Sequence, residues 1–162
     1  MDLDVEKLLL PISPESPCGD DLSYDPAFLE IEQIAAGKPE QQVGATIIPA
    51  EDPDWKQLRA RCADLLGRTK DLRVVMHLAL ASVKLDGIPG LRDGLALLRG
   101  VLERYWEQVH PQLDPGDGND PLVRMNIISG LTEPLLFRRS IREAPAEMGY
   151  RGRLARVVMS GR

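Results

Sequence analysis

The chain has 162 residues, of which 43% are hydrophobic and 28% charged, and its formal net charge is −5. This length and hydrophobic content predict one ordinary domain, or one domain with a short tail, and they exclude disorder of the whole chain. No apolar run is long enough to cross a membrane, and the acidic start MDLDVEK lacks the basic region of a secretory signal. We therefore expect a soluble protein without direct membrane insertion.

Charge is divided unevenly along the chain. Residues 1–54 carry a net charge of −11 and residues 55–162 a net charge of +6, with seven arginines against two glutamates in 138–162. Such asymmetry indicates either docking of one half on the other or two faces for different partners. Nucleic acid is not among the expected partners, because the basic end has little aromatic interleaving and the chain as a whole is acidic.

Asp-Pro pairs at 25–26, 52–53 and 120–121 each predict the start of a helix, since aspartate caps the free amides and proline suits the first turn. The first two predicted helices end at Gly37 and Gly67. Residues 71–87 are apolar around most of a helix circumference, which predicts a central helix.

The segment from 88 to 110 predicts a helix of about 20 residues with a clean apolar seam. The seam consists of Leu91, Leu95, Leu98, Leu102, Tyr105 and Val109. Gly94 and Gly100 lie inside it, and because glycine weakens a helix they indicate a close approach to a neighbouring helix. His110 follows at the expected helix end, where a positive charge suits the helix dipole.

A last long helix is predicted from Leu122, Met125, Ile128 and Leu131, ending or kinking at Pro134, with a short helix over 135–141. Strand signals are confined to short runs near 45–49 and 153–159. The expected fold is all-α: a bundle of five to six helices with an irregular N-terminal strap and at most a minor β-hairpin. Residues 1–140 form the helical domain in this interpretation, and 141–162 form a basic tail or the start of a linker to further C-terminal regions.

The stretch between Gly37 and Trp55 is rich in proline and glycine, yet it contains an apolar cluster. We expect Val43, Ile47 and Ile48 to fix it to the core as a packed strap; a partner-docking edge is the alternative. Its polar side supplies the candidate partner-binding residues, which are Lys38, Glu40, Gln41, Gln42 and Glu51.

The residues with catalytic or metal-binding chemistry form no complete motif. Asp20, Asp21 and Asp25 would suit a metal or acid–base site with help from His110, but a helix cap and a glycine turn explain them more simply. His77 is expected to be a hydrogen-bonded, partly buried residue of the core. Cys18 and Cys62 lack metal-site spacing and are expected as free thiols rather than a disulfide. No cofactor and no enzymatic activity are expected.

Several phrases of the sequence occur together in one order. They are PISPESPCGDDLSYDPAFLEIE, GKPEQQ, IPAEDPDW, RTKDLRV, LDGIPGL, GLALLRGVLERYWEQVHPQLDP and DGNDPLVRMNII. Over about Pro11 to Leu136 the chain closely resembles the ImpA-related N-terminal domain of the TssA proteins of bacterial type VI secretion systems.

The resemblance implies a cytoplasmic, non-enzymatic adaptor that is associated with the secretion apparatus. It implies binding to baseplate, tube or sheath, or membrane-complex proteins during assembly of the tail. It also implies that full-length relatives form homo-oligomers through C-terminal regions that this sequence does not contain. The alternative function is a small metal-binding or hydrolytic helical domain that uses Asp20, Asp21 and Asp25.

Overall fold

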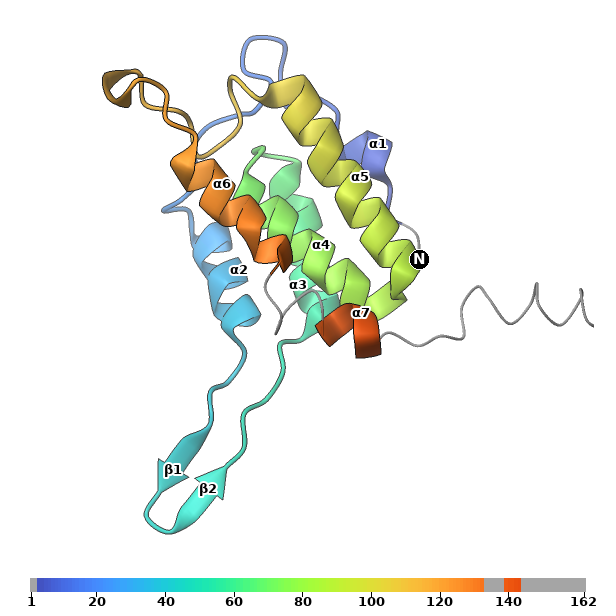
Figure 1. Ribbon diagram of the computed structural model, residues 1–162, viewed down its shortest axis with the longest axis vertical. Helices are drawn as coiled ribbons and strands as arrows, with labels where there is room; N and C mark the ends of the chain where they lie inside the picture. Colours follow the sequence, from blue (N-terminus) through green and yellow to red (C-terminus); the bar gives the residue numbers. More distant parts are fainter. Residues whose placement is uncertain (1–2, 133–138, 144–162) are drawn as a thin grey trace, which may run out of the picture.

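The computed structural model describes residues 3–132 and 139–143. Its elements in chain order are α1 (Val5–Leu8), α2 (Pro26–Ala36), β1 (Gln41–Val43), β2 (Thr46–Ile48), α3 (Trp55–Leu66), α4 (Leu72–Asp86), α5 (Ile88–Tyr105), the 3-10 turn η1 (Pro115–Asp117), α6 (Leu122–Ser129), the 3-10 turn η2 (Gly130–Thr132) and α7 (Arg139–Glu143). The predicted all-α bundle with a minor hairpin is confirmed (Figure 1). Among these helices, none is long and apolar enough to span a membrane. The predicted tail beyond 143, its β-capable run and Pro134 lie outside the described residues.

Helix α4 forms the centre of the bundle, as its composition predicts. It begins after Asp71, whose carboxylate accepts a hydrogen bond from the Arg73 amide at 2.8 Å. Ten of its fifteen residues are buried, and the one polar residue among them, Ser82, donates to the Leu78 carbonyl at 2.8 Å. Because the other long helices pack around it (Figure 1), an apolar surface on nearly every side is stabilising.

Glycines bring α5 close to its neighbours, which confirms the sequence prediction. A Cβ atom added to Gly94 would lie 2.8 Å from the Ala79 Cβ of α4, and one added to Gly100 would lie 2.5 Å from a Leu9 methyl. Both distances are too short for a carbon–carbon contact. The cost of glycine in a helix is therefore offset by closer packing.

The predicted seam of α5 was wrong in part. Leu95 is 43% exposed, whereas Leu97, two positions further, is fully buried. The small residues Gly90 and Gly94 face α4, because only that side of α5 can approach so closely. The helix also ends at Tyr105 rather than near 110, although Val109 beyond it is still buried.

Aspartates accept hydrogen bonds at the starts of α2 and α6 as expected, although the N-cap residue of α6 is Pro121, and a different aspartate caps α3. Asp25 accepts a hydrogen bond from the Ala27 amide at 2.8 Å at the start of α2. Asp120 accepts one from the Leu122 amide at 2.9 Å at the start of α6. Helix α3 is capped by Asp54, which bonds the Gln57 amide at 3.0 Å, so the prediction of Asp52 was wrong. Asp54 caps α3 because it directly precedes the first helical residue, Trp55, whereas Asp52 lies two residues too early.

The prediction that 38–51 forms a strap fixed to the core was wrong. This segment folds on itself as the antiparallel hairpin β1–β2, which projects from the bundle at the bottom of Figure 1. Val43, Ile47 and Ile48 are 64%, 62% and 43% exposed, so they do not fix this segment to the core. A local turn at Gly44 lets the two strands pair with each other instead of packing on the core, and apolar side chains alone do not require burial.

Helix α6 also departs from its predicted pattern. Leu122, Val123 and Met125 are each more than half exposed, whereas Arg124 is only 1% exposed. The helix touches the core through Ile127 and, just beyond its end, Leu131. Near the start of α6, Arg124 occupies the side that faces the core, where it donates hydrogen bonds to backbone carbonyls. The neighbouring apolar side chains therefore face outward.

Candidate functional site

The base of the hairpin is closed by a double backbone hydrogen bond. The Lys38 amide donates to the Glu51 carbonyl at 3.0 Å, and the Glu51 amide donates back to the Lys38 carbonyl at 2.9 Å. Their side chains form an ion pair with an Nζ–Oε2 distance of 2.6 Å. Gly37 ends α2 with φ of 61°, and a Cβ there would lie 2.6 Å from the Glu51 oxygen. Only glycine therefore permits this exit from the bundle.

A tight turn joins the two strands. Val43 pairs with Thr46 across the two-residue loop of Gly44 and Ala45. Gly44 has a φ of 63° and Ala45 does not have a positive φ, which fits a type II′ turn. The Gln42 amide side chain donates to the Gly44 carbonyl at 3.2 Å and supports the same turn.

All six strand residues of the hairpin are exposed, so both faces of the sheet are open. The register pairs Gln41 with Ile48 and Gln42 with Ile47, which places Val43 and Ile48 on one face and Ile47 on the other. Within the described ranges, each strand has a neighbour on one side only. Such a sheet offers unpaired backbone groups and apolar side chains to a partner.

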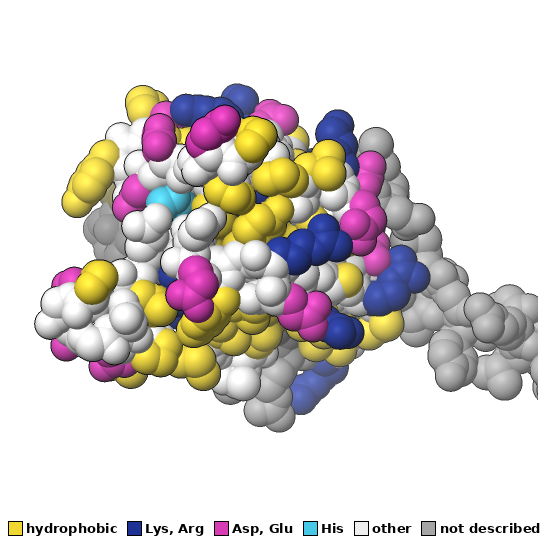
Figure 2. Space-filling view, turned by 90° about the horizontal axis from the view of Figure 1, so that it is seen from above, with side chains coloured by type: hydrophobic (Ala, Val, Ile, Leu, Met, Phe, Trp, Pro, Cys, Tyr) yellow, Lys and Arg dark blue, Asp and Glu magenta, His cyan; other side chains and the backbone are white. Residues whose placement is uncertain are grey.

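The five predicted partner-binding residues all lie on this hairpin and are exposed: Lys38, Glu40, Gln41, Gln42 and Glu51. Between residues 38 and 54 the sequence contains four carboxylates against one lysine, so the hairpin and its exit are acidic. By contrast, acidic and basic side chains are intermixed on the view of the molecule from above (Figure 2). The hairpin thus combines an open edge, exposed apolar side chains and a net negative charge.

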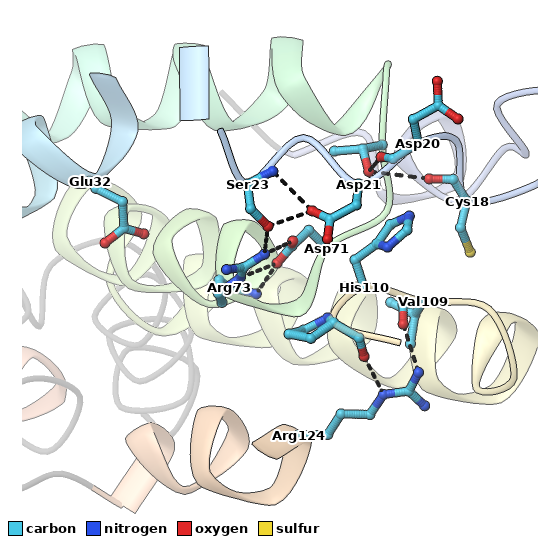
Figure 3. Close-up of polar contacts among 12 residues, drawn as sticks. Cys18, Asp20, Asp21, Ser23, Glu32, Asp71, Arg73, Val109, His110 and Arg124 are labelled. Atoms are coloured by element: carbon cyan, nitrogen blue, oxygen red, sulfur yellow. Dashed lines mark hydrogen bonds and ion pairs between the residues drawn. The ribbon is translucent and has the colours of Figure 1, made fainter. Parts of the chain in front are cut away.

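Two of the three acidic residues of the alternative site, Asp21 and Asp25, serve separate structural tasks. Asp21 accepts hydrogen bonds from the Ser23 amide and hydroxyl, and these bonds lower the pKa of its carboxyl. Asp25 caps α2 and pairs with Arg68 at 2.6 Å, which lowers its pKa as well. The Asp20 side chain points away from this network in Figure 3. No group of ligands suited to a metal ion occurs among the described residues.

A buried ladder of backbone hydrogen bonds joins three segments that are distant in the sequence. The Lys70 amide donates to the Cys18 carbonyl at 2.7 Å, the His110 amide donates to the Lys70 carbonyl at 3.0 Å, and the Leu72 amide donates to the His110 carbonyl at 2.9 Å. The His110 ring lies 2.9 Å from the Gly19 carbonyl. His110 is therefore a structural residue of this ladder, and the prediction that it ends a helix was wrong.

Lys70 anchors two helix ends from inside the protein. Its ammonium group is buried and donates to the carbonyls of Leu8 and Leu66, both at 2.8 Å. Burial lowers the pKa of Lys70 to about 8. The carbonyls at the ends of α1 and α3 would otherwise lack partners, so this amine replaces water there.

Arg124 does the same for the segment that follows α5. Its guanidinium donates to the carbonyls of Pro111 at 2.8 Å and Val109 at 2.7 Å, and also to that of Trp106 (Figure 3 shows the bond to Val109). It lies 4.8 Å from the centre of the Trp106 ring. We call the ladder residues 18–20, 69–72 and 110, together with Arg124, the polar cluster. The hydrogen bonds of this cluster join parts of the protein to one another and are not directed toward a ligand.

The remaining candidates are accounted for in the same way. Cys18 and Cys62 are buried free thiols, as predicted, and burial raises the pKa of both. The His77 ring lies 3.0 Å from the Glu32 carboxylate, which confirms its expected hydrogen bond. The sequence interpretation missed Lys70 and Arg124. A long cationic side chain is usually interpreted as solvent-facing, and nothing in the local pattern identified the carbonyls to which these two donate.

Comparison with known proteins identifies relatives over the same region. The family described as ImpA, N-terminal, type VI secretion system, matches residues 9–133. A type VI secretion system component TssA1 from Pseudomonas aeruginosa is 55% identical over 135 residues, covering 83% of this chain and 39% of the relative.

A solved structure agrees with this match. The N-terminal domain including the conserved ImpA_N region of the TssA component from Burkholderia cenocepacia superposes with a TM-score of 0.66 at 33% identity, over 82% of this chain and 48% of that chain. The chain thus spans less than half the length of the relatives it matches. On these matches and on its fold, the chain belongs to the ImpA N-terminal family of type VI secretion system TssA components.

Proposed function

We propose that this domain is a non-enzymatic adaptor in the assembly of a type VI secretion apparatus and that it docks through the hairpin 38–51. The expected partners are baseplate, tube or sheath, or membrane-complex proteins on the cytoplasmic side. The observation that carries the proposal is the hairpin itself. It stands outside the core with three large apolar side chains exposed and a closed, ion-paired base. A segment of this kind contributes little to the core but offers contact area to a partner.

The metal-binding or hydrolytic alternative has no comparable observation behind it. Asp21 and Asp25 are committed to Ser23 and to the start of α2, and His110 is committed to the buried ladder. A catalytic reading would require these groups to leave contacts that stabilise the fold.

The proposal is tested by binding the chain to purified baseplate, sheath, tube and membrane-complex proteins of the secretion system from the same bacterium. At least one component is expected to bind. Glu40→Lys combined with Glu51→Lys is expected to weaken that binding about tenfold, because the hairpin would lose its acidic character. The melting temperature should change little, since both side chains are exposed.

The matched control reverses two acidic residues elsewhere, Glu103→Lys in α5 and Asp117→Lys in η1, which are also exposed. This control has the same change of net charge, so a general electrostatic effect would weaken both variants alike. Equal binding by the hairpin variant and the unaltered chain would show that docking does not depend on the hairpin. Binding to none of the components would refute the adaptor function.

A further inference from the structure

The two faces of the hairpin sheet differ in how much apolar surface they present. Successive residues of a strand point to opposite faces, and residues paired across the two strands share a face. The register therefore defines one face, the Val43 face, which consists of Gln41, Val43, Thr46 and Ile48. The opposite face, the Ile47 face, consists of Gln42 and Ile47.

Val43 and Ile48 form a diagonal pair on the Val43 face. Val43 lies directly opposite Thr46, and Ile48 lies two residues beyond Thr46 on the same strand. Diagonal neighbours of this kind are roughly 7–8 Å apart, so one partner surface can contact both. Both side chains remain open to solvent, at 64% and 43% exposure, and the methyl group of Thr46 adds to the apolar area between them.

Ile47 has no apolar neighbour on its own face of the sheet. The residue opposite it is Gln42, whose side-chain amide donates to the Gly44 carbonyl at 3.2 Å and is held at the turn. A partner that covered Ile47 would also have to cover this polar amide. Ile47 is 62% exposed, but a single exposed apolar side chain is ordinary on a protein surface.

We propose that the hairpin docks through the Val43 face, and that its partner is a protein surface with an apolar recess bordered by lysine or arginine side chains. This inference rests on the proposed docking function of the hairpin and specifies the contact face and the partner's chemistry. Val43 and Ile48 enter the recess together, because adjoining apolar side chains exclude water from a contact better than isolated ones do.

The charge of the hairpin determines the border of the recess. Residues 38–54 contain four carboxylates against one lysine, and that lysine, Lys38, already pairs with Glu51. Glu40, Asp52 and Asp54 are exposed as well. Basic side chains around the recess complement this charge. A second copy that presented the same face would bring two acidic hairpins together, which is unfavourable.

Ile48→Thr and Ile47→Thr separate the two faces. They are the same substitution at adjacent positions of β2, and threonine keeps the branched shape that strands favour. Binding of each variant to the purified baseplate, sheath, tube and membrane-complex proteins is measured by titration calorimetry. Ile48→Thr should weaken the affinity about tenfold through loss of apolar contact, whereas Ile47→Thr should change it less than about twofold. Exposure alone predicts the reverse order, since Ile47 is the more exposed of the two.

Two further measurements test the face and the partner's charge independently. Val43→Thr, on the other strand of the Val43 face, should weaken binding about fivefold. Raising the salt concentration from about 0.05 to 0.5 M should weaken binding of the unaltered chain, because salt screens the attraction between opposite charges. NMR contacts between paired residues of β1 and β2 should persist in all three variants, since the substituted side chains are exposed.

The outcomes distinguish this inference from the adaptor function. Weakening by Ile48→Thr and Val43→Thr that does not exceed the weakening by Ile47→Thr would overturn docking through the Val43 face. Affinity that is unchanged by salt, or that rises with it, would overturn the basic border. Self-association that Ile48→Thr abolishes would assign the face to a second copy instead. Binding of the unaltered chain to none of the components would refute the adaptor function and this inference with it, whereas retained binding with the wrong order of variants would refute the inference alone.

Discussion

The polar cluster and the hairpin use the same kinds of residue for opposite purposes. In the cluster, Lys70 and Arg124 are each 1% exposed and donate only to backbone carbonyls. In the hairpin, the side chains of Lys38 and Glu51 are 74% and 61% exposed and pair with each other. The charged groups of the cluster stabilise the folded protein from inside. Those of the hairpin lie at the surface, where a partner can reach them. The position of a charge in the fold, rather than its type, decides its role.

The largest expected effect tests the cluster. Arg124→Met should lower the free energy of unfolding by about 3 kcal/mol, because buried carbonyls at Trp106, Val109 and Pro111 would lose their donors. Urea denaturation measures the change. The control is Arg99→Met, since the Arg99 side chain is 77% exposed and its pair with Glu103 should contribute less than about 0.5 kcal/mol. Similar losses of unfolding free energy in the two variants would show that buried and exposed cations do not differ in their contribution to stability.

A smaller effect should appear in acid at the rim of the cluster. Hydrogen bonds from Ser23 hold the pKa of Asp21 below its ordinary value of 3.8. A carboxyl with a lowered folded-state pKa stabilises the protein above that ordinary value, and the stabilisation is lost as pH falls through the folded-state pKa.

Thermal melts between pH 7 and pH 3 should therefore show a shallower acid loss in Asp21→Asn than in the unaltered chain. We expect a difference of about 0.5 kcal/mol, reduced from the buried case because the side chain is exposed. An unchanged acid profile would mean that the Ser23 contacts contribute no stability. Glu15→Asn serves as the control, as Glu15 is exposed outside any helix.

The smallest effect concerns the hairpin. Ile47→Thr combined with Val43→Thr should change the free energy of unfolding by less than about 0.5 kcal/mol, since both side chains are exposed and threonine keeps the branched shape that strands favour. Leu97→Thr provides the contrast, because Leu97 is fully buried in α5 and its replacement should be severe. Marked destabilisation by the hairpin pair would show that this segment serves the core after all.

Much of the fold follows from local patterns in the sequence. The Asp25-Pro26 start of α2, the apolar circumference of α4 and the close approach at Gly94 each depend on residues within one or two helices. The sequence interpretation failed where the outcome depends on which element a segment packs against. Val43 and Ile47 are apolar, but only the paired strands show that their segment never reaches the core.

The candidate site also has a part that the sequence predicts and a part that it does not. The outward position of the polar residues Lys38 to Glu51 was predictable, because their composition suits an exposed segment. Their arrangement on a hairpin was not, since it depends on the close passage of Gly37 past the Glu51 carbonyl. Arg124 was unpredictable for a similar reason. Its environment is made by carbonyls at 106, 109 and 111, which no helical periodicity reveals.

The ladder through Cys18, Lys70 and His110 also bears on how the chain can be divided. A fragment that ended after Tyr105 would contain every helix from α1 to α5, yet the Lys70 carbonyl and the Leu72 amide would lack their partner at His110. The carbonyls of Trp106, Val109 and Pro111 likewise have their guanidinium donor only in a fragment that extends to Arg124. The smallest unit that folds completely is set by this closure and not by the helical bundle alone.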